Sequence, residues 1–471
     1  MRTILVVILI ALVGVLGTTY WFGVEVERSY GSAMTEIGKS RGVRVIRHSF
    51  DRGVLSSVAE TELEFGSRGY GFRIVSKDRI IHGPFAIGGL IGGDSGLALT
   101  QALIKSEVRF KGFTGTGSGI PGPLEKLPPL EFNSELLISG GLVTTLEIEP
   151  VTRSYGEGLD LDFKGFRGEF RLGADGNTVF AKFDAPLVDL KAPEAHVTMT
   201  GFRASFEFNG WLPTLYTPLG SSESVVKKLL VKTNDESIEL DDVVVTSLTK
   251  ENAGSLAHNQ KFSLRRLVVD GREYGPGSVG IAISNLDVQA LTTLKEAFYE
   301  IESRRGIGDD ERDRLMMFKT LELMPELLKR APEFEIKGLS FRTPDGETRG
   351  SFKVYVDNTD PEALGSIFKL SSAVNAELGF SMPTATLKSI MRVATKKDIA
   401  RERENAGERP LNNEELEVMA EKQVAGRIEE LLDLGLLVAK DKRYSFNASY
   451  KSGDLLVNGG PMPLIPSIPF P

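Results

Sequence analysis

Short runs of alternating apolar and polar residues recur from residue 43 to about residue 286, and they constrain the fold more than any other feature of this sequence. A strand turns successive side chains to opposite faces, so this period of two predicts a sheet with one wet face. Turn residues separate the runs, and Asp-Gly pairs at residues 175–176 and 270–271 favour tight hairpins. In residues 54–65 (VLSSVAETELEF), one face is predicted to carry Leu55, Ser57, Ala59, Thr61, Leu63 and Phe65. We therefore expect residues 43–286 to form an antiparallel meander in one large curved sheet.

The composition supports a β-rich chain without covalent cross-links. Glycine supplies 50 of 471 residues and cysteine is absent, so disulfides and thiolate metal sites are excluded. The net charge of −8 comes from both signs mixed along the chain. Because no basic face is available for a phosphate backbone, nucleic acid is not an expected partner.

A run without charged side chains, Ile4–Gly23, follows Arg2. Such a run of about 20 residues is long enough to span a hydrocarbon core of about 30 Å, which predicts a transmembrane helix in residues 1–24. Aromatic rings at its outer end suit the headgroup interface. The residues expected to anchor the chain are Ile4, Leu9, Leu12, Leu16, Tyr20, Trp21 and Phe22.

The positive charge lies before this run, so the positive-inside rule places the amino terminus in the cytoplasm and the rest of the chain on the other side. A cleaved signal peptide is the alternative, but Val15-Leu16-Gly17 is a poor cleavage site. A retained anchor is therefore favoured. Residues 25–42 are compatible with a short juxtamembrane helix leading away from the bilayer.

The second half of the chain adds helices to the sheet, in an α+β, β-rich fold. Apolar stripes at helical spacing predict helices over residues 285–305, 309–332, 383–403 and 413–434, and Asn285 or Asp287 is suited to cap the first. Strands return at residues 334–343 and 349–357 and in a closing hairpin at 444–460. Residues 287–460 thus continue the sheet with two helical pairs. The proline-rich tail, residues 461–471, should be extended.

No cofactor and no metal ion is expected. Gly115, Gly117 and Gly119 precede Ile120-Pro121 instead of a helix, whereas a phosphate cradle needs a helix N-terminus. The histidines at positions 48, 82, 196 and 258 lack the spacing of zinc ligands. Clustered carboxylates such as Glu60, Glu62 and Glu64 are typical of a solvated sheet face.

The stretch HSFDRGVLSS, His48–Ser57, raises the hypothesis of a hydrolytic triad made of His48, Asp51 and Ser56. Members of a triad usually come from separate elements of a rigid scaffold, whereas this stretch looks like two strands joined by a turn at residues 51–53. A hairpin turn is favoured and no catalytic residue is expected. His82, at a strand end before Gly83-Pro84, is interpreted as a hydrogen-bonded structural histidine.

Several stretches together resemble the YdgA family of bacterial envelope proteins. They are HSFDRGVLSS, IHGPF (Ile81–Phe85), AVNAELGFSMPT (Ala373–Thr384) and the closing hairpin Tyr444–Pro463, and the resemblance covers nearly the whole chain. The residues that carry the family pattern are Phe50, Arg52, Gly53, Ser56, Ser57, His82, Gly83, Pro84 and Phe85. The resemblance implies an inner-membrane anchor with a periplasmic body in a Gram-negative bacterium, and it supplies no reaction.

Two main functions remain open on this basis. The first is a non-enzymatic, membrane-anchored envelope scaffold whose curved sheet presents a lipid-facing surface, with the inner membrane and lipid as partners. The second is an interaction module or homodimer that docks on an envelope protein or a second copy through a sheet edge or the proline-rich tail. A hydrolase is a third and weaker hypothesis.

Overall fold

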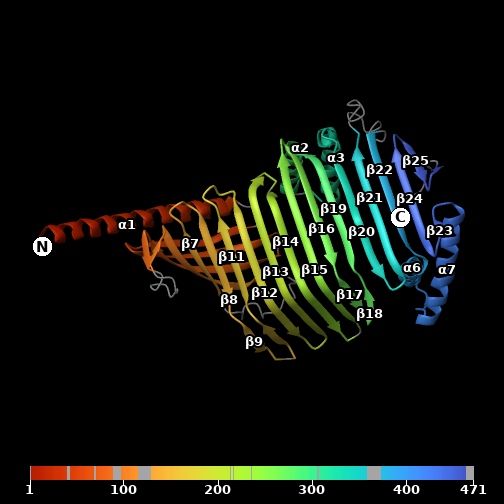
Figure 1. Cartoon of the computed structure of the whole chain (residues 1–471), viewed down its shortest axis with the longest axis horizontal. Helices are drawn as coiled ribbons and strands as arrows, with labels where there is room; N and C mark the ends of the chain where they lie inside the picture. The colour runs from red at the N-terminus through yellow and green to blue at the C-terminus, as the bar shows by residue number, and fades with distance from the viewer. Residues whose placement is uncertain are drawn as a thin grey trace. The chain divides into compact units, whose positions relative to one another are not determined.

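The computed structural model divides the chain into two compact units, Met1–Gly210 and Trp211–Pro471. Both are built mainly of long antiparallel strands (Figure 1). The structure describes residues 2–39, 43–67, 70–87, 97–114, 129–156, 158–212, 214–215, 217–234, 236–304, 307–357 and 373–462. The predicted β-rich fold with a large open antiparallel sheet and helices is confirmed at this level.

In its described residues, the first unit consists of one helix and a sheet that follows the order of the chain with few exceptions. Its helix is α1 (Arg2–Lys39). Its main strands are β1 (Val43–Arg52), β2 (Ser56–Ser67), β3 (Tyr70–His82), β6 (Ala102–Thr114), β7 (Leu130–Leu136), β8 (Leu142–Ile148), β9 (Val151–Ser154), β10 (Asp160–Phe163), β11 (Phe166–Leu172), β12 (Val179–Lys191) and β13 (Ala195–Leu212), which ends in the second unit. They pair antiparallel in the order β1–β2–β3–β6–β7–β8–β11–β12–β13, and β10 pairs with β9 and β12. A small hairpin is formed by β4 (Phe85–Ile87) and β5 (Leu97–Leu99).

The two faces of this first sheet differ in character. Residues directly opposite each other on neighbouring strands share a face. One such row runs through Phe132, Leu146, Gly168, Phe183 and Ala204, all at least half-buried. The alternate residues of these strands, whose side chains point to the opposite face, are mostly charged and exposed, as at Arg167, Lys182, Arg203 and Glu207. The sheet therefore has one apolar and one charged face, as the period of two predicted.

The second unit is also a sheet, joined by four helices in the part that the structure describes. Its strands are β14 (Thr217–Thr233), β15 (Ser237–Asn252), β16 (Ser255–Leu264), β17 (Arg266–Val269), β18 (Arg272–Tyr274), β19 (Gly277–Asp287), β20 (Glu333–Thr343), β21 (Gly346–Val356), β22 (Val374–Pro383), β23 (Val438–Lys440), β24 (Arg443–Lys451), β25 (Asp454–Val457) and β26 (Gly460–Met462). They pair in the order β14–β15–β16–β19–β20–β21–β22–β24–β25–β26. Three short strands pair beside this main order: β17 pairs with β15 and with β18, and β23 pairs with β24.

The helices of the second unit come in two consecutive pairs, as the sequence predicted. The first pair is α2 (Val288–Ser303) and α3 (Asp309–Leu328), and the second is α6 (Thr384–Asn405) and α7 (Asn413–Asp433). Helix α7 starts with a full capping box between Asn412 and Glu415. Its buried face, with Val424 and Ile428, packs on Phe380 and Phe446 of the sheet. The chain after Met462 lies outside the described residues, and with it most of the proline-rich tail.

Helix α1 merges two segments that the sequence analysis had separated. It is continuous for 38 residues from the apolar run into the predicted juxtamembrane segment. The side chains of Ile4, Leu9 and Leu12 lie outside the described part of the chain. Within the described part, none of the helices combines the length and the apolar character needed to cross a membrane. The membrane anchor therefore stays a prediction.

Asp287 fixes the junction of β19 and α2. Of the two caps considered from the sequence, it is the one that caps the helix, because its carboxylate accepts a hydrogen bond of 2.8 Å from the backbone N–H of Ala290. Arg330 Nε donates to the same carboxylate at 2.6 Å. Burial opposes the ionisation of Asp287, but these hydrogen bonds outweigh it and hold its pKa below the ordinary value.

We predict that Asp287→Ala destabilises the second unit by about 3 kcal/mol, because it removes a cap and leaves the guanidinium of Arg330 without its buried partner. Urea unfolding followed by circular dichroism measures the change. Asp309→Ala is the matched control, since that acid also lies at a helix start but its side chain is 92% exposed. Equal effects of the two substitutions would contradict the structural role of Asp287.

Candidate functional site

The residues that carry the family pattern gather under helix α1 in the first unit. Arg52 ends β1, and Ser57 lies opposite it near the start of β2. His82 ends β3, next to the start of β2. We call Tyr20, Gly23 and Glu27 of α1, together with Arg52, Ser57 and His82 of the sheet, the helix clasp. Two sheet motifs that lie far apart in the sequence thus meet one helix.

Arg52 holds the helix through two contacts. Its Nε lies 2.9 Å from a carboxylate oxygen of Glu27, and its guanidinium carbon lies 4.9 Å from the centre of the Tyr20 ring. The ion pair is half-exposed, so it contributes at most about 1 kcal/mol, and the cation–π contact adds a similar amount. Arg52 therefore orients the helix and supplies only part of the binding energy.

His82 lies at the centre of the helix clasp and is 2% exposed. Its Nδ1 lies 3.2 Å from the carbonyl oxygen of Val54, which can only accept, so Nδ1 carries the proton. Its Nε2, 2.8 Å from Ser57 Oγ, then accepts a hydrogen bond from the Ser57 hydroxyl. Burial lowers the pKa of His82, as does the nearby charge of Arg52, against the opposing effect of the Val54 hydrogen bond. The hydrogen bonding predicted for this histidine is thus present, and the neutral imidazole is favoured.

Gly23 allows helix α1 to approach the imidazole of His82. A Cβ atom added at Gly23 would lie 2.5 Å from Cε1 of His82, closer than carbon atoms approach. Next along the helix, Val26 is 5% exposed and packs with Ala59, Ile80 and Ala102. Tyr30 then donates or accepts a hydrogen bond with Thr61 and packs on Phe50, with ring centres 5.3 Å apart. Helix α1 therefore covers the apolar face at this end of the sheet.

The hydrolytic triad does not assemble. His48 and Asp51 are exposed on β1, where they pair with Thr61 and Val58, and Ser56 is exposed at the start of β2. Gly53 closes the turn by donating to the carbonyl of Ser56 at 2.8 Å. The strands form the hairpin that was favoured over the triad. Ser57 and His82 do have the relative geometry of a nucleophile and a base, but α1 covers both, and a backbone carbonyl stands where a carboxylate would.

The remaining motif residues shape the corner beyond His82. A Cβ atom at Gly83 would lie 1.6 Å from the carbonyl oxygen of Thr100, so only glycine fits there. The following bond to Pro84 is cis, and Pro84 accepts a hydrogen bond of 3.1 Å from the N–H of Thr100. The side chain of Phe85 and residues 115–128 of the predicted glycine-rich loop lie outside the described residues.

Sequence reasoning missed Gly23, Glu27 and Tyr30, the helix partners in this site. Gly23 offered a signal, because glycine costs about 1 kcal/mol inside a helix and is retained there for a packing reason. Glu27 offered no such signal in the sequence, since the spacing of residues in a helix does not tell which distant strand the helix will contact. The described residues contain no cluster of three or more His, Asp or Glu side chains that could hold a metal ion.

A second feature of the first unit lies on strands β11, β12 and β13. On the apolar face, phenylalanine and small residues alternate both along and across the strands: Phe170 faces Ala181 and then Phe206, while Gly168 faces Phe183 and then Ala204. We call this pattern the phenylalanine checkerboard; its members are Phe166, Phe170, Phe183, Phe202, Phe206 and Phe208 with Gly168, Ala181, Ala185 and Ala204. Ring centres are 5.8 Å apart for Phe166 and Phe183 and 6.0 Å apart for Phe183 and Phe206.

The rings of the phenylalanine checkerboard cover the small residues and are themselves only partly buried. The alanines are between 4% and 6% exposed because neighbouring rings lie over them. Helix α1 contacts β1, β3 and β6 of the same sheet. An apolar sheet face normally packs on another layer. On β11–β13 this face presents a row of adjoining, partly exposed aromatic rings.

The second unit repeats an apolar face on its own strands. Phe262 lies opposite Val279, Ile336 lies opposite Phe352, and Phe352 lies opposite Leu378. Phe262 is 37% and Leu378 is 40% exposed. Helix α7 covers this face only near Phe380 and Phe446.

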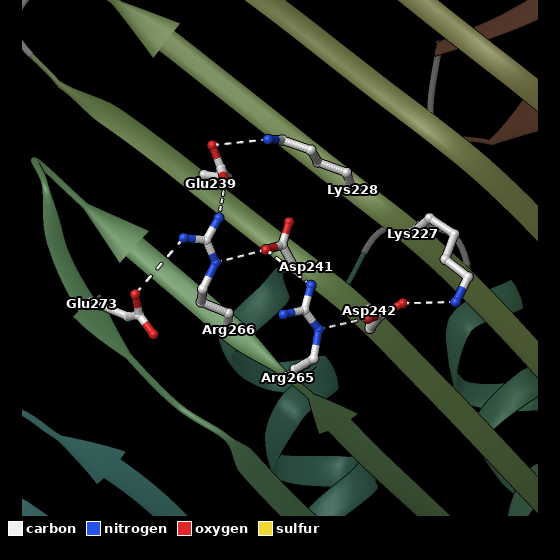
Figure 2. A network of polar contacts seen from close by, with 8 residues as sticks. All are labelled: Lys227, Lys228, Glu239, Asp241, Asp242, Arg265, Arg266 and Glu273. Carbon is white, nitrogen blue, oxygen red and sulfur yellow. Dashed lines mark hydrogen bonds and ion pairs between the residues drawn. The ribbon is translucent and has the colours of Figure 1, made fainter.

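A charge network in the second unit has a structural role (Figure 2). Arg265 and Arg266 lie between Asp241, Asp242 and Glu239, and Lys227, Lys228 and Glu273 complete the group. The start of β15 pairs with β17 and the rest of β15 pairs with β16, in one continuous register. Arg265 lies at the junction between β16 and β17, opposite Asp242, which has a positive φ of 48°. Hydrogen bonds from Lys227 and Arg265 hold the pKa of Asp242 below its ordinary value. Because cations and anions balance, the network fixes strands and leaves no net charge for an ionic ligand.

Comparison with known proteins places the chain in a family. A family model described as bacterial protein of unknown function (DUF945) matches residues 1–465, and the chain belongs to this family. No curated protein and no solved structure matches the chain. The narrower resemblance to the YdgA family remains a prediction.

We predict that Gly23→Ala loosens helix α1, because the clash with His82 costs about 1–3 kcal/mol and exceeds the gain in helix propensity of about 1 kcal/mol. Hydrogen exchange of β2 and β3 should accelerate. Gly31→Ala in the same helix is the control, since a Cβ atom there meets nothing within 4 Å. Unchanged exchange in Gly23→Ala would show that the helix does not rest on His82.

We also predict that the helix clasp weakens in acid. The pKa of His82 is lower in the folded chain than its ordinary value of 6.5, so the unfolded or undocked state binds the proton more readily. The contribution of His82 is complete above pH 6.5 and falls by up to about 1.4 kcal/mol per pH unit below it, until the folded pKa is reached.

Spin labels at Arg28→Cys and Ser49→Cys, placed on exposed positions of α1 and β1 in this cysteine-free chain, measure docking as a distance. The docked population should fall below pH 6.5. His82→Asn does not titrate and should remove this pH dependence; an unchanged profile in that variant would assign the effect to another group.

Proposed function

Starting from membership of a bacterial family of unknown function, we propose that this chain is a membrane-tethered envelope protein whose apolar sheet face holds the acyl chains of lipids. The observation that carries the proposal is the phenylalanine checkerboard, a partly exposed aromatic surface on one face of the sheet. The opposite face of the same strands is charged and suits water.

The size of the interaction favours a lipid as the occupant. Each buried methylene contributes about 0.8 kcal/mol, so ten methylenes lying on the rings would contribute about 8 kcal/mol before the cost of ordering the chain. An acyl chain has no polar group that the face would leave unpaired. The described apolar face offers no charged side chain in the row from Phe132 to Ala204, which a soluble ionic ligand would need.

The membrane tether supports the same occupant. The uncharged run Ile4–Gly23 belongs to the helix that covers the start of the apolar face, so the segment suited to a bilayer and the face suited to acyl chains adjoin. In this proposal the body of the protein lies in the periplasm of a Gram-negative cell, and no reaction is required of it. The second candidate, a homodimer or an interaction module, is an alternative outcome of the test.

We predict that a phospholipid with a photoreactive acyl chain crosslinks to β11–β13 when the full chain is reconstituted in vesicles. Phe206→Ser should reduce this crosslinking roughly tenfold, as expected for the loss of one ring contact of about 1–2 kcal/mol. Glu207→Ser, the neighbouring residue on the charged face, is the matched control and should leave crosslinking unchanged. Mass spectrometry of the peptides locates the crosslinks.

Two outcomes would contradict the proposal. Crosslinks confined to residues 4–23 would show that lipid meets the tether and not the sheet. Native mass spectrometry that finds a lipid-free dimer would favour the interaction module. A carbonate wash of membranes tests the tether separately, because a chain released into the supernatant is not retained by a membrane-spanning segment.

A further inference from the structure

We propose that the β1–β2 corner and the adjoining part of α1 form a surface that lies in the headgroup region of the bilayer. We call this surface the apolar collar; it consists of Leu16, Tyr20 and Trp21 of α1, Val54 and Leu55 of the corner, and Leu99 of β5. The proposal rests on the membrane tether of the proposed function and adds a second membrane contact, made by the folded sheet.

The apolar collar is exposed to an unusual degree. The exposed fractions of its side chains range from 40% for Leu16 to 65% for Leu99, and both corner residues exceed 50%. Single exposed apolar side chains are ordinary, but a group of them at one site indicates contact with another apolar body. The turn at Gly53 needs no apolar residues, so Val54 and Leu55 are not explained by the hairpin itself.

Contacts of the helix clasp bring the six side chains to one end of the unit. The ring of Tyr20 lies against Arg52, two residues before Val54. His82 binds the carbonyl of Val54 through Nδ1 and donates its backbone N–H to the carbonyl of Leu55 at 3.0 Å. Leu99 precedes Thr100, whose carbonyl lies against Gly83. The corner, the β5 hairpin and the helix are therefore fixed to one another through His82 and Gly83.

The level of the apolar collar along α1 matches the expected boundary of a bilayer. A helix rises about 1.5 Å per residue, so the segment from residue 4 to residue 22 measures about 28 Å, close to the thickness of a hydrocarbon core. The boundary then falls at Tyr20–Phe22, the part of α1 that meets the corner. Charged residues begin one turn later, at Glu25. Tyrosine and tryptophan prefer this boundary, and Arg52 can reach the phosphate level beside them.

A bilayer is favoured over a protein partner because the apolar run of the same chain already brings this end of the unit to a membrane. The uncharged run continues directly from the apolar collar, so a membrane around that run ends at the level of α1 that meets the corner of Val54 and Leu55. A second copy of the chain would have to approach the same corner past that membrane.

Environment-sensitive fluorophores test the contact in the full chain, reconstituted in vesicles of phosphatidylethanolamine and phosphatidylglycerol. The absence of cysteine allows single labels at Leu55→Cys, at Ile138→Cys as the control and at Leu9→Cys in the apolar run. Ile138 is 47% exposed in a turn of the same unit and is matched in exposure and chemistry. Lipids with a quencher near the headgroup should quench the label at position 55 several-fold more strongly than the label at position 138.

The result separates the two proposals. If the label at position 9 is quenched by deep quenchers while positions 55 and 138 behave alike, the tether stands and the apolar collar contact is overturned. If no position is quenched, the tether and the apolar collar both fail. An emission shift at position 55 without lipid-dependent quenching would mean that a second protein copy covers the corner, which also overturns the proposal.

Discussion

The hydrogen-bond ladder between antiparallel strands is the constraint on which the rest of this structure depends. Without disulfides, each strand is held by its two neighbours and by the side chains beside it. Burial per residue is correspondingly modest, and small residues such as Ala181 and Ala204 are buried by neighbouring rings. The alternation of charged and apolar faces follows from this construction, because every side chain on a single layer meets either water or whatever lies on the apolar face.

Helix α1 is the exception that gives one end of the first sheet a conventional core. It packs through a glycine, a valine and a tyrosine on three strands, and the motif residues Arg52, Ser57 and His82 all serve this contact. A histidine at the centre of such a contact is sensitive to its surroundings, since it must remain neutral while it is buried. The motif stretches that suggested a catalytic site in the sequence therefore serve to position a helix.

Much of the architecture could be predicted from local pattern. The period of two in residues 54–65 assigned Ser57, Ala59 and Thr61 to one face, and all three are buried. It was wrong for Leu55 on the same face, which is 53% exposed at the corner, and for Glu62 on the opposite face, which is 7% exposed. Asn285 or Asp287 was expected to cap α2, because capping depends on neighbours in the sequence, and the structure selects Asp287. The contact of Arg52 with Glu27 was not predicted, because it depends on how α1 crosses the sheet. The Ser57–His82 hydrogen bond needed the register of β2 on β3, and the phenylalanine checkerboard needed the register of three strands together.

The nearly sequential pairing of strands bears on how the chain acquires its structure. Most strands bind the one that precedes them in the chain, and the two largest excursions between paired strands of the second unit carry helices: α2 and α3 between β19 and β20, and α6, α7 and β23 between β22 and β24. Loops between paired strands are therefore short, and the entropy lost in closing each of them is small. A sheet of this kind can grow from its amino-terminal strand, each new segment finding its partner already in place, so that folding keeps pace with the emergence of the chain.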